Sequence, residues 1–272
     1  MVDSKPKDSF NDSALGVEFL NRIAAFETIR AYHGKFFHLD AHLDRLGDSC
    51  RGLGHELPMD KAAWIAWIRT TLQESGFLDA IMRISVHWRA AGEGVIISMT
   101  RPFVTHPPEW YQQGVTLSTT SQRRPSFRAQ DSGIKCSQYV SGVLATIDQG
   151  AETSHELIFL GPAESVAEGT VSNLFIVKSK RILTPSAASG ILSGVTRNFV
   201  IFLCQSMGYE VSETMLTRHD IYTADECFIT NTSSEVLGVV RVDGRRIGEG
   251  VPGPITKNLH QNFRMSIEES LL

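Results

Sequence analysis

The sequence has few cysteines, little excess charge and no long hydrophobic run. Its four cysteines are Cys50, Cys136, Cys204 and Cys227, and none of them forms a C-x-x-C pair. This spacing argues against a zinc knuckle or a disulfide framework and favours a reducing cytoplasm. The polar first residues lack the apolar core of a signal peptide, and no stretch approaches the roughly 20 apolar residues of a membrane span. We therefore expect a soluble cytoplasmic protein that is not exported.

Charge and histidine spacing argue against further classes of partner. The formal net charge is −4 and the isoelectric point is near 6.1, which gives no general attraction to nucleic acid or to anionic membranes. The nine histidines show no metal-ligand spacing such as H-E-x-x-H, so we expect no metal site. An anionic cofactor or substrate would therefore be bound by local cations.

Hydrophobic periodicity predicts mixed helices and strands in the first hundred residues. Residues 25–32 alternate like a strand, and a turn at 33–35 leads into Phe36 as a hairpin. Apolar residues at helical spacing predict a helix over 39–50 with Asp40 as N-cap. A second helix is expected up to Ser75, with Asp60 as its cap and Gly76 as its end. Two further strands are expected at 80–88 and 95–99.

Prolines divide the chain. Residues 101–109 contain three prolines, which favour extended backbone, and we place an interdomain linker at 105–112. The predicted domains are a small N-terminal domain, residues 1–104, and a large one, residues 113–272. In the second domain we expect strands at 114–118, 156–160, 174–178 and 226–230, and helices at 139–149 and 196–207. A glycine-bearing stretch at 244–250 is expected to be a hairpin turn.

Four segments carry the chemistry. Lys135 precedes a predicted helix, Glu168 precedes an apolar run, Thr196 opens a helix, and Thr232 lies in a turn rich in hydroxyl groups. A lysine, a carboxylate and two such turns match the aldehyde, ring nitrogen and phosphate of pyridoxal phosphate. The start of a helix is a natural anion site because its first N–H groups are unpaired.

The residues of these segments and their order in the chain resemble those of the class IV aminotransferases. The matching stretches are Ile-Lys-Cys-Ser-Gln-Tyr at 134–139, Glu-Gly-Thr-Val-Ser-Asn-Leu-Phe at 168–175, Gly-Ile-Leu-Ser-Gly-Val-Thr-Arg at 190–197 and Thr-Asn-Thr-Ser-Ser-Glu at 230–235. The resemblance runs from about Phe26 to Phe263. It implies an α+β, two-domain fold-type IV enzyme with pyridoxal 5'-phosphate, in which a large domain of mixed strands and helices surrounds the cofactor.

The resemblance also implies roles for single residues. Lys135 would bind the cofactor covalently and shuttle the substrate α-proton, and Glu168 would keep the ring nitrogen protonated. Arg45 would bind the phosphate; the alternative is an exposed helix arginine paired with Asp48. The remaining cofactor-binding candidates are Tyr139 at the ring hydroxyl, Leu192 at the ring face, and Ser172, Asn173, Val195, Thr196, Asn231 and Thr232.

Three functions remain open on the sequence. The leading one is an aminotransferase similar to the branched-chain or D-amino-acid enzymes, which acts on an amino acid and a 2-oxo acid, with Arg30, Arg89 and Ser233 as substrate-binding candidates. The second is 4-amino-4-deoxychorismate lyase, because that enzyme tends to carry residues matching Thr28 and Asn231 and uses the threonine hydroxyl in proton transfer. The third is a pyridoxal-phosphate-binding protein without turnover. Family members complete each active site across a homodimer, so we expect a homodimer here.

Overall fold

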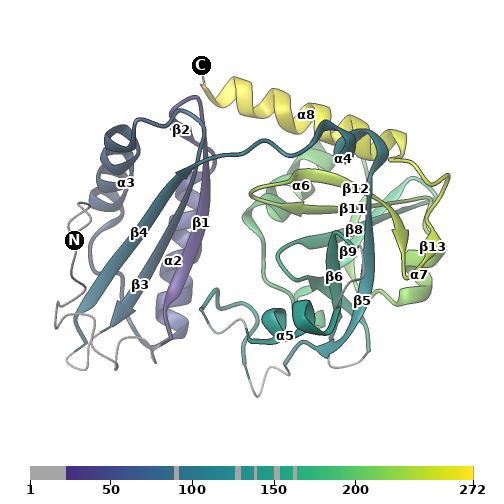
Figure 1. Cartoon of the computed structure of the whole chain (residues 1–272), viewed down its shortest axis with the longest axis horizontal. Helices are drawn as coiled ribbons and strands as arrows, with labels where there is room; N and C mark the ends of the chain where they lie inside the picture. Colours follow the sequence, from purple (N-terminus) through teal and green to yellow (C-terminus); the bar gives the residue numbers. More distant parts are fainter. Residues whose placement is uncertain are drawn as a thin grey trace. The chain divides into compact units, whose positions relative to one another are not determined.

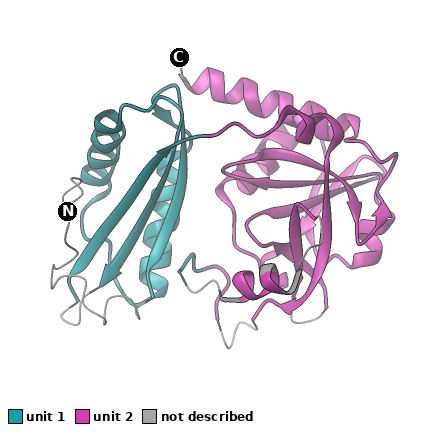
Figure 2. Ribbon diagram, in the orientation of Figure 1, with its two compact units in different colours: residues 1–103, 134–138 teal, residues 104–133, 139–272 magenta. Residues whose placement is uncertain are grey.

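The computed structural model describes residues 23–88, 92–125, 130–137, 140–149, 154–161 and 164–271. The chain divides into two compact units, which Figure 2 colours separately. Unit 1 consists of residues Met1–Phe103 and Ile134–Gln138, and unit 2 of residues Val104–Gly133 and Tyr139–Leu272. Both units combine strands with helices, so the predicted α+β class is confirmed. In the part of the chain that is described, no helix is long and apolar enough to cross a membrane.

The described residues of unit 1 form an antiparallel sheet and two helices (Figure 1). Its strand order is β2-β1-β3-β4, with β1 at Ala25–Tyr32, β2 at Lys35–Phe36, β3 at Ala80–Trp88 and β4 at Gly94–Pro102. The helices are α2 (Leu39–Gly52) and α3 (Lys61–Ser75). Ile29 of β1 packs with Leu46 and Trp64 of the helices in one apolar core. The alternation of β1 thus directs every second side chain toward α2 and α3.

Helices α2 and α3 differ in how their N-termini are capped. Asp60 caps α3 as predicted, because its side chain accepts the N–H of Ala63 at 2.8 Å, and Gly76 ends the helix at φ 70°. The prediction that Asp40 caps α2 is wrong. That helix begins after His38, and Asp40 lies in its first turn, where a negative charge is favourable without a capping bond.

Unit 2 is built on a nine-stranded mixed sheet. The order is β10-β9-β8-β11-β12-β5-β6-β7, with β13 paired to β12. The strands are β5 (Val115–Arg123), β6 (Glu156–Leu160), β7 (Val166–Gly169), β8 (Asn173–Lys178), β9 (Arg181–Pro185), β10 (Val211–Thr214), β11 (Glu226–Asn231), β12 (Glu235–Val242) and β13 (Arg245–Arg246). The helices are α4 (Pro108–Gln113), α5 (Val140–Gln149), the 3₁₀ helix η2 (Ala187–Ser189), α6 (Val195–Ser206), α7 (Arg218–Tyr222) and α8 (Pro254–Leu271).

Most predicted elements of unit 2 are present, and β12 and β13 form the hairpin expected at 244–250. Strands β7, β9 and β10, the 3₁₀ helix η2 and helices α4, α7 and α8 were not predicted. The start of α8 is fixed by the buried carboxylate of Glu226, which accepts the N–H groups of Ile255 and Thr256 at 3.0 and 2.8 Å. The segment 105–112 belongs to unit 2 and contains most of α4. The domain boundaries given above stay a prediction.

Candidate active site

Lys135 is anchored within unit 1 by its backbone. The N–H of Phe26 donates to the Lys135 carbonyl at 3.0 Å, and the N–H of Ser137 donates to the Ala24 carbonyl at 2.8 Å. Residues 135–137 thereby extend the sheet along β1, on the edge that β3 leaves open. On the other side the N–H of Lys135 donates to Ser49 Oγ of α2 at 3.1 Å. The main chain at Lys135 is therefore fixed by both a strand and a helix.

Helix α2 approaches this segment closely. A Cβ added at Gly52 would lie 2.9 Å from Ile134 Cδ1, so the glycine leaves the room that Ile134 fills. The half-buried Lys135 places its Nζ 4.5 Å from the centre of the Phe26 ring. Its charge is also one of the influences that lower the pKa of His42 on α2, after the larger effect of burial. Lys135 is thus part of a packed cluster rather than a solvated surface lysine.

A fully buried carboxylate, Glu27, joins β1 to α2. Arg45 donates to it twice, from Nε to Oε1 at 2.6 Å and from Nη2 to Oε2 at 2.7 Å. His42 Nδ1 lies 2.8 Å from Oε2. Burial alone would raise the pKa of Glu27, but the charges and hydrogen bonds of Arg45 and His42 together lower it to about 2. Glu27 is therefore ionised at neutral pH.

This arrangement rules out one of the two interpretations of Arg45, the exposed helix arginine paired with Asp48. The arginine pairs with Glu27, whereas the ion pair of Asp48 is made by the neighbouring Arg51. The Arg45 side chain is 13% exposed and points to the strand rather than to solvent. The alternative of an exposed helix arginine is wrong.

The other face of β1 carries Thr28 and Arg30. Thr28 is half-buried and lies opposite Arg83 of β3. Arg30 is buried, and its guanidinium lies 4.1 Å from the ring centre of Tyr32 and 3.5 Å from that of Phe103. Such ring contacts hold the guanidinium in place. Both residues alternate with Glu27, so they lie on the sheet face opposite α2.

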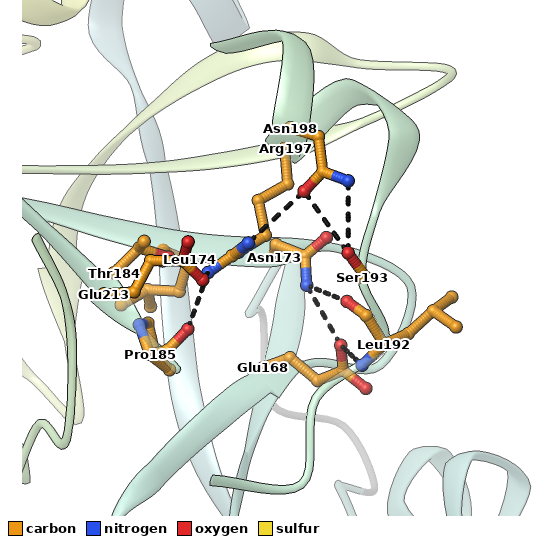
Figure 3. A network of polar contacts seen from close by, with 10 residues as sticks. All are labelled: Glu168, Asn173, Leu174, Thr184, Pro185, Leu192, Ser193, Arg197, Asn198 and Glu213. Carbon is orange, nitrogen blue, oxygen red and sulfur yellow. Dashed lines mark hydrogen bonds and ion pairs between the residues drawn. The ribbon is translucent and has the colours of Figure 1, made fainter. Parts of the chain in front are cut away.

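Glu168 lies at the centre of a polar network in unit 2. Arg124 Nη2 is 2.8 Å from Oε1, and the N–H of Leu192 donates to Oε2 at 2.9 Å. The Asn173 amide donates to the same oxygen at 3.1 Å (Figure 3). Arg124 is itself held because its Nε donates to the Gly190 carbonyl at 3.1 Å. Arg124, Leu192 and Asn173 together fix the position of the buried Glu168 carboxylate.

Asn173 connects this network to the start of α6. Its amide nitrogen bridges Glu168 and the Leu192 carbonyl, the latter at 2.9 Å (Figure 3). On its other side, a Cβ added at Gly194 would lie 2.1 Å from Asn173 Oδ1. The glycine is needed for this close approach, which brings Glu168, Leu192 and the first turn of α6 together.

Val195 and Thr196 form the first turn of α6, a helix of 12 residues whose N-cap is Gly194. A glycine offers no side chain to pair with the first N–H groups, so these donors are left for another acceptor. Thr196 is buried, and its hydroxyl belongs to the same turn. The following Arg197 is occupied elsewhere, since Nη2 donates to the Pro185 carbonyl at 2.9 Å and to Glu213 at 2.7 Å (Figure 3).

The predicted cofactor-binding residue Ser172 bonds to a buried glutamate, Glu156. Its hydroxyl donates to Glu156 Oε2 at 2.8 Å, and the N–H groups of Val171 and Ser172 donate to Oε1 at 2.6 and 3.0 Å. Burial raises the pKa of Glu156 despite these donors. A Cβ at Gly169 would lie 2.2 Å from Glu156 Oε1. Ser172 and Glu156 therefore shape the turn between Glu168 and Asn173.

The late turn is organised by Asn231. Its Oδ1 accepts the N–H groups of Ser233 and Ser234 at 2.9 and 2.6 Å, which is an Asx turn. Ser233 Oγ lies 3.2 Å from His106 Nε2. Thr232, which lies between Asn231 and Ser233 in this turn, is half-buried. The side chain of Asn231 thus fixes the backbone from which Thr232 and Ser233 project.

Two predicted residues, Arg89 and Tyr139, lie outside the described residues. Several residues that hold the site together had no assigned role in the sequence: Glu27, Ser49, Arg124 and Glu156. Only Glu27 left a signal, as a carboxylate inside an otherwise strand-like, largely apolar run. Within the described ranges, no group of three His, Cys, Asp or Glu side chains could hold a metal ion.

Comparison with known proteins identifies the family. The family model described as Amino-transferase class IV matches residues 24–242. A branched-chain-amino-acid aminotransferase of Pseudomonas aeruginosa is 32% identical over 259 residues, which cover 89% of this chain and 83% of the relative. A D-alanine aminotransferase of Bacillus licheniformis is 30% identical over 249 residues, which cover 89% and 87%.

A solved structure agrees with these sequence relatives. The crystal structure of the T.th. branched-chain amino acid aminotransferase with pyridoxamine 5'-phosphate matches with a TM-score of 0.85 at 27% identity. The match covers 90% of this chain and 85% of that chain. Fold, motif and sequence relatives agree, and the chain belongs to the class IV aminotransferase family.

Proposed function

We propose that the protein is a pyridoxal 5'-phosphate-dependent aminotransferase that moves an amino group between an amino acid and a 2-oxo acid. The observation that carries this proposal is the Glu168 network. It places a buried, charge-balanced carboxylate and the open N-terminus of α6 on either side of one asparagine, Asn173. A carboxylate suits the ring nitrogen of the cofactor, and a helix N-terminus suits its phosphate.

The side chains present fit this cofactor. Glu168 would hold the ring nitrogen, and Leu192, whose backbone is bonded to Glu168, would support the ring. Val195 and Thr196 would hold the phosphate with their N–H groups and a hydroxyl, assisted by Arg45. The residues Tyr139, Ser172, Asn173, Asn231 and Thr232 complete the proposed cofactor-binding set. When bound, the cofactor supplies an electron sink for the electrons left by the substrate α-proton.

Lys135 supplies the amine of the site. Its side chain would bind the cofactor covalently, and once released its amine would take the substrate α-proton and hold it for delivery. The backbone bonds to Phe26 and Ser49 fix the point from which the side chain extends. A base held at one fixed point would keep the abstracted proton inside the site and away from bulk water while the amino group is transferred.

The substrates and the assembly belong to the same proposal. Arg30, Arg89 and Ser233 are the proposed substrate-binding residues, with Arg30 held by two aromatic rings. The relatives include enzymes named for branched-chain amino acids and for D-alanine. We therefore propose an amino acid of one of these two types as the substrate. We propose a cytoplasmic homodimer. Light scattering at assay concentration tests the assembly, and an active monomer would contradict it.

Covalent labelling tests the proposed function. The purified protein should absorb in the visible range, and borohydride reduction followed by peptide mass analysis should find the pyridoxyl group on Lys135. Lys135→Ala should lose the label and the amino transfer. Lys61→Ala is the matched control, because Lys61 is an exposed lysine of unit 1 that pairs with Asp44. A pyridoxyl group on any other lysine would refute the assignment.

A further inference from the structure

The Glu27 cluster has a geometry that fixes an orientation. Two parallel bonds from Nε and Nη2 of Arg45 reach the two oxygens of Glu27, at 2.6 and 2.7 Å. This bidentate contact sets the plane of the guanidinium as well as its position. His42 Nδ1, at 2.8 Å from Oε2, holds the carboxylate from a second direction. The side chain of Arg45 therefore has one defined orientation.

A contribution to folding stability does not by itself explain why Glu27 is buried with Arg45 and His42. Glu27 is fully buried, and its strand neighbours on the same face, Ala25 and Ile29, belong to the apolar core. Moving a carboxylate out of water costs more free energy than many ion pairs return, and apolar residues of similar volume often stabilise such a position better. A buried carboxylate with a bidentate arginine thus points to a positioning role.

The same strand and the same helix also hold Lys135. Phe26, the residue before Glu27, donates its N–H to the Lys135 carbonyl, and Ser49 on α2 accepts the Lys135 N–H. Arg45 and Ser49 are four residues apart in α2, so they lie on one face of the helix. Within unit 1, the pairing of β1 with α2 therefore sets the place of Lys135 and of Arg45 together.

We infer that Glu27 is the positioning residue of Arg45, and that it holds the guanidinium where Arg45 binds the phosphate of the cofactor. This inference rests on the proposed function, in which Arg45 is a phosphate ligand. Glu27 acts only through Arg45: it takes no proton from the substrate and does not itself bind the anion, since two carboxylate oxygens would repel a phosphate. His42 supports it by keeping Oε2 in place.

Cofactor retention by the holoenzyme measures this role without turnover. Equilibrium dialysis with absorbance detection gives the dissociation constant of the cofactor, and the ³¹P NMR signal reports the surroundings of its phosphate. Glu27→Gln should weaken retention about tenfold and shift the phosphate signal, a typical effect of removing a group that orients a ligating side chain. Glu27→Asp keeps the charge but shortens the reach, so it should also weaken retention while preserving the fold.

A double-mutant cycle separates positioning from general loss of stability. Arg45→Ala should weaken retention at least as much as Glu27→Gln, and the double variant should be no weaker than Arg45→Ala alone. Glu226→Gln is the control, because that buried carboxylate bonds to the first turn of α8, away from Arg45 in the chain. It should lower the unfolding temperature and leave the dissociation constant unchanged.

Each outcome has one meaning. Retention within twofold of the parent for both Glu27 variants would overturn the inference, and so would additive losses in the double variant. If Arg45→Ala retains the cofactor normally, the phosphate role of Arg45 in the proposed function fails. If Arg45→Ala loses the cofactor while the Glu27 variants keep it, the proposed function stands and only the positioning role of Glu27 fails.

Discussion

The ionised state of Glu27 predicts a defined loss of stability in acid. Its pKa is lowered from the ordinary value of 4.5 to about 2, because the charges and hydrogen bonds of Arg45 and His42 outweigh burial. The folded protein thus binds this proton less readily than the unfolded chain. The stabilisation is complete above the unfolded value of 4.5 and disappears as the pH falls toward the folded value near 2. The difference between these values corresponds to about 3 kcal/mol of unfolding free energy.

Urea unfolding of the parent and of Glu27→Gln between pH 3 and pH 7 measures this contribution. Trp64 and Trp67 lie in or against the core of unit 1, so fluorescence contributes a signal from the unit that contains Glu27. The advantage of the parent over the variant should be constant between about pH 6 and 7 and should shrink by about 1 kcal/mol per pH unit between pH 4 and 3. Other carboxylates titrate in both proteins and cancel in the difference.

Two controls make this test specific. His42 is a second titrating group at the same carboxylate, so the comparison is repeated in a His42→Gln background to remove its protonation. Glu74→Gln changes an exposed glutamate on α3 of the same unit and should give no comparable slope. An advantage of the parent that stays constant from pH 5 to pH 3 would refute the argument that Glu27 is held in its charged form.

Three further changes test the site in unit 2 and the type of reaction. Glu168→Gln should keep the cofactor but slow α-proton removal about 100-fold or more, because it removes a fixed charge at the ring; single-turnover absorbance at the parent rate would contradict this. Gly194→Ala should cost about 1–3 kcal/mol of unfolding free energy and weaken cofactor retention, since its Cβ would lie 2.1 Å from Asn173 Oδ1; an unchanged calorimetric trace would mean that the turn relaxes freely. Thr28→Ala should alter donor preference and leave amino transfer intact; pyruvate release from aminodeoxychorismate that depends on Thr28 would instead indicate the lyase reaction.

Local patterns in the sequence predicted local structure well. The strand over residues 25–32, the helix between Asp60 and Gly76, and the strand over 156–160 all carry their signals within a few residues. The short motifs around Glu168 and Thr196 were found for the same reason. The residues of each motif lie next to one another in the chain, whereas the hydrogen bonds of Leu192 that join the motifs span 19 and 24 positions.

Long-range partners could not be predicted in this way. Arg124 meets Glu168 across 44 positions and leaves no pattern that distinguishes it from Arg123, which pairs with the exposed Glu164. The addition of residues 135–137 to β1 joins parts of the chain more than 100 residues apart. Helix α8 was missed because its sequence is largely polar, and its start depends on Glu226, which lies far from it in sequence.

Helix α2 shows why the burial of its polar face could not be predicted from the sequence. Its apolar stripe, which contains Leu43, Leu46 and Cys50, predicted the helix and its core side. Each of these residues is preceded by a polar one, His42, Arg45 or Ser49, and a polar stripe beside an apolar one is typical of a solvent-exposed face.

In the structure His42 is 2% and Ser49 is 1% exposed, because the strand β1 and the Lys135 segment cover this second stripe. Buried polar groups must find partners, and here the partners are the Glu27 carboxylate and the Lys135 backbone. The polar face of α2, which the sequence pattern suggested was solvent-exposed, therefore connects Arg45, the proposed phosphate ligand, and Lys135, the proposed active-site lysine, to the same strand.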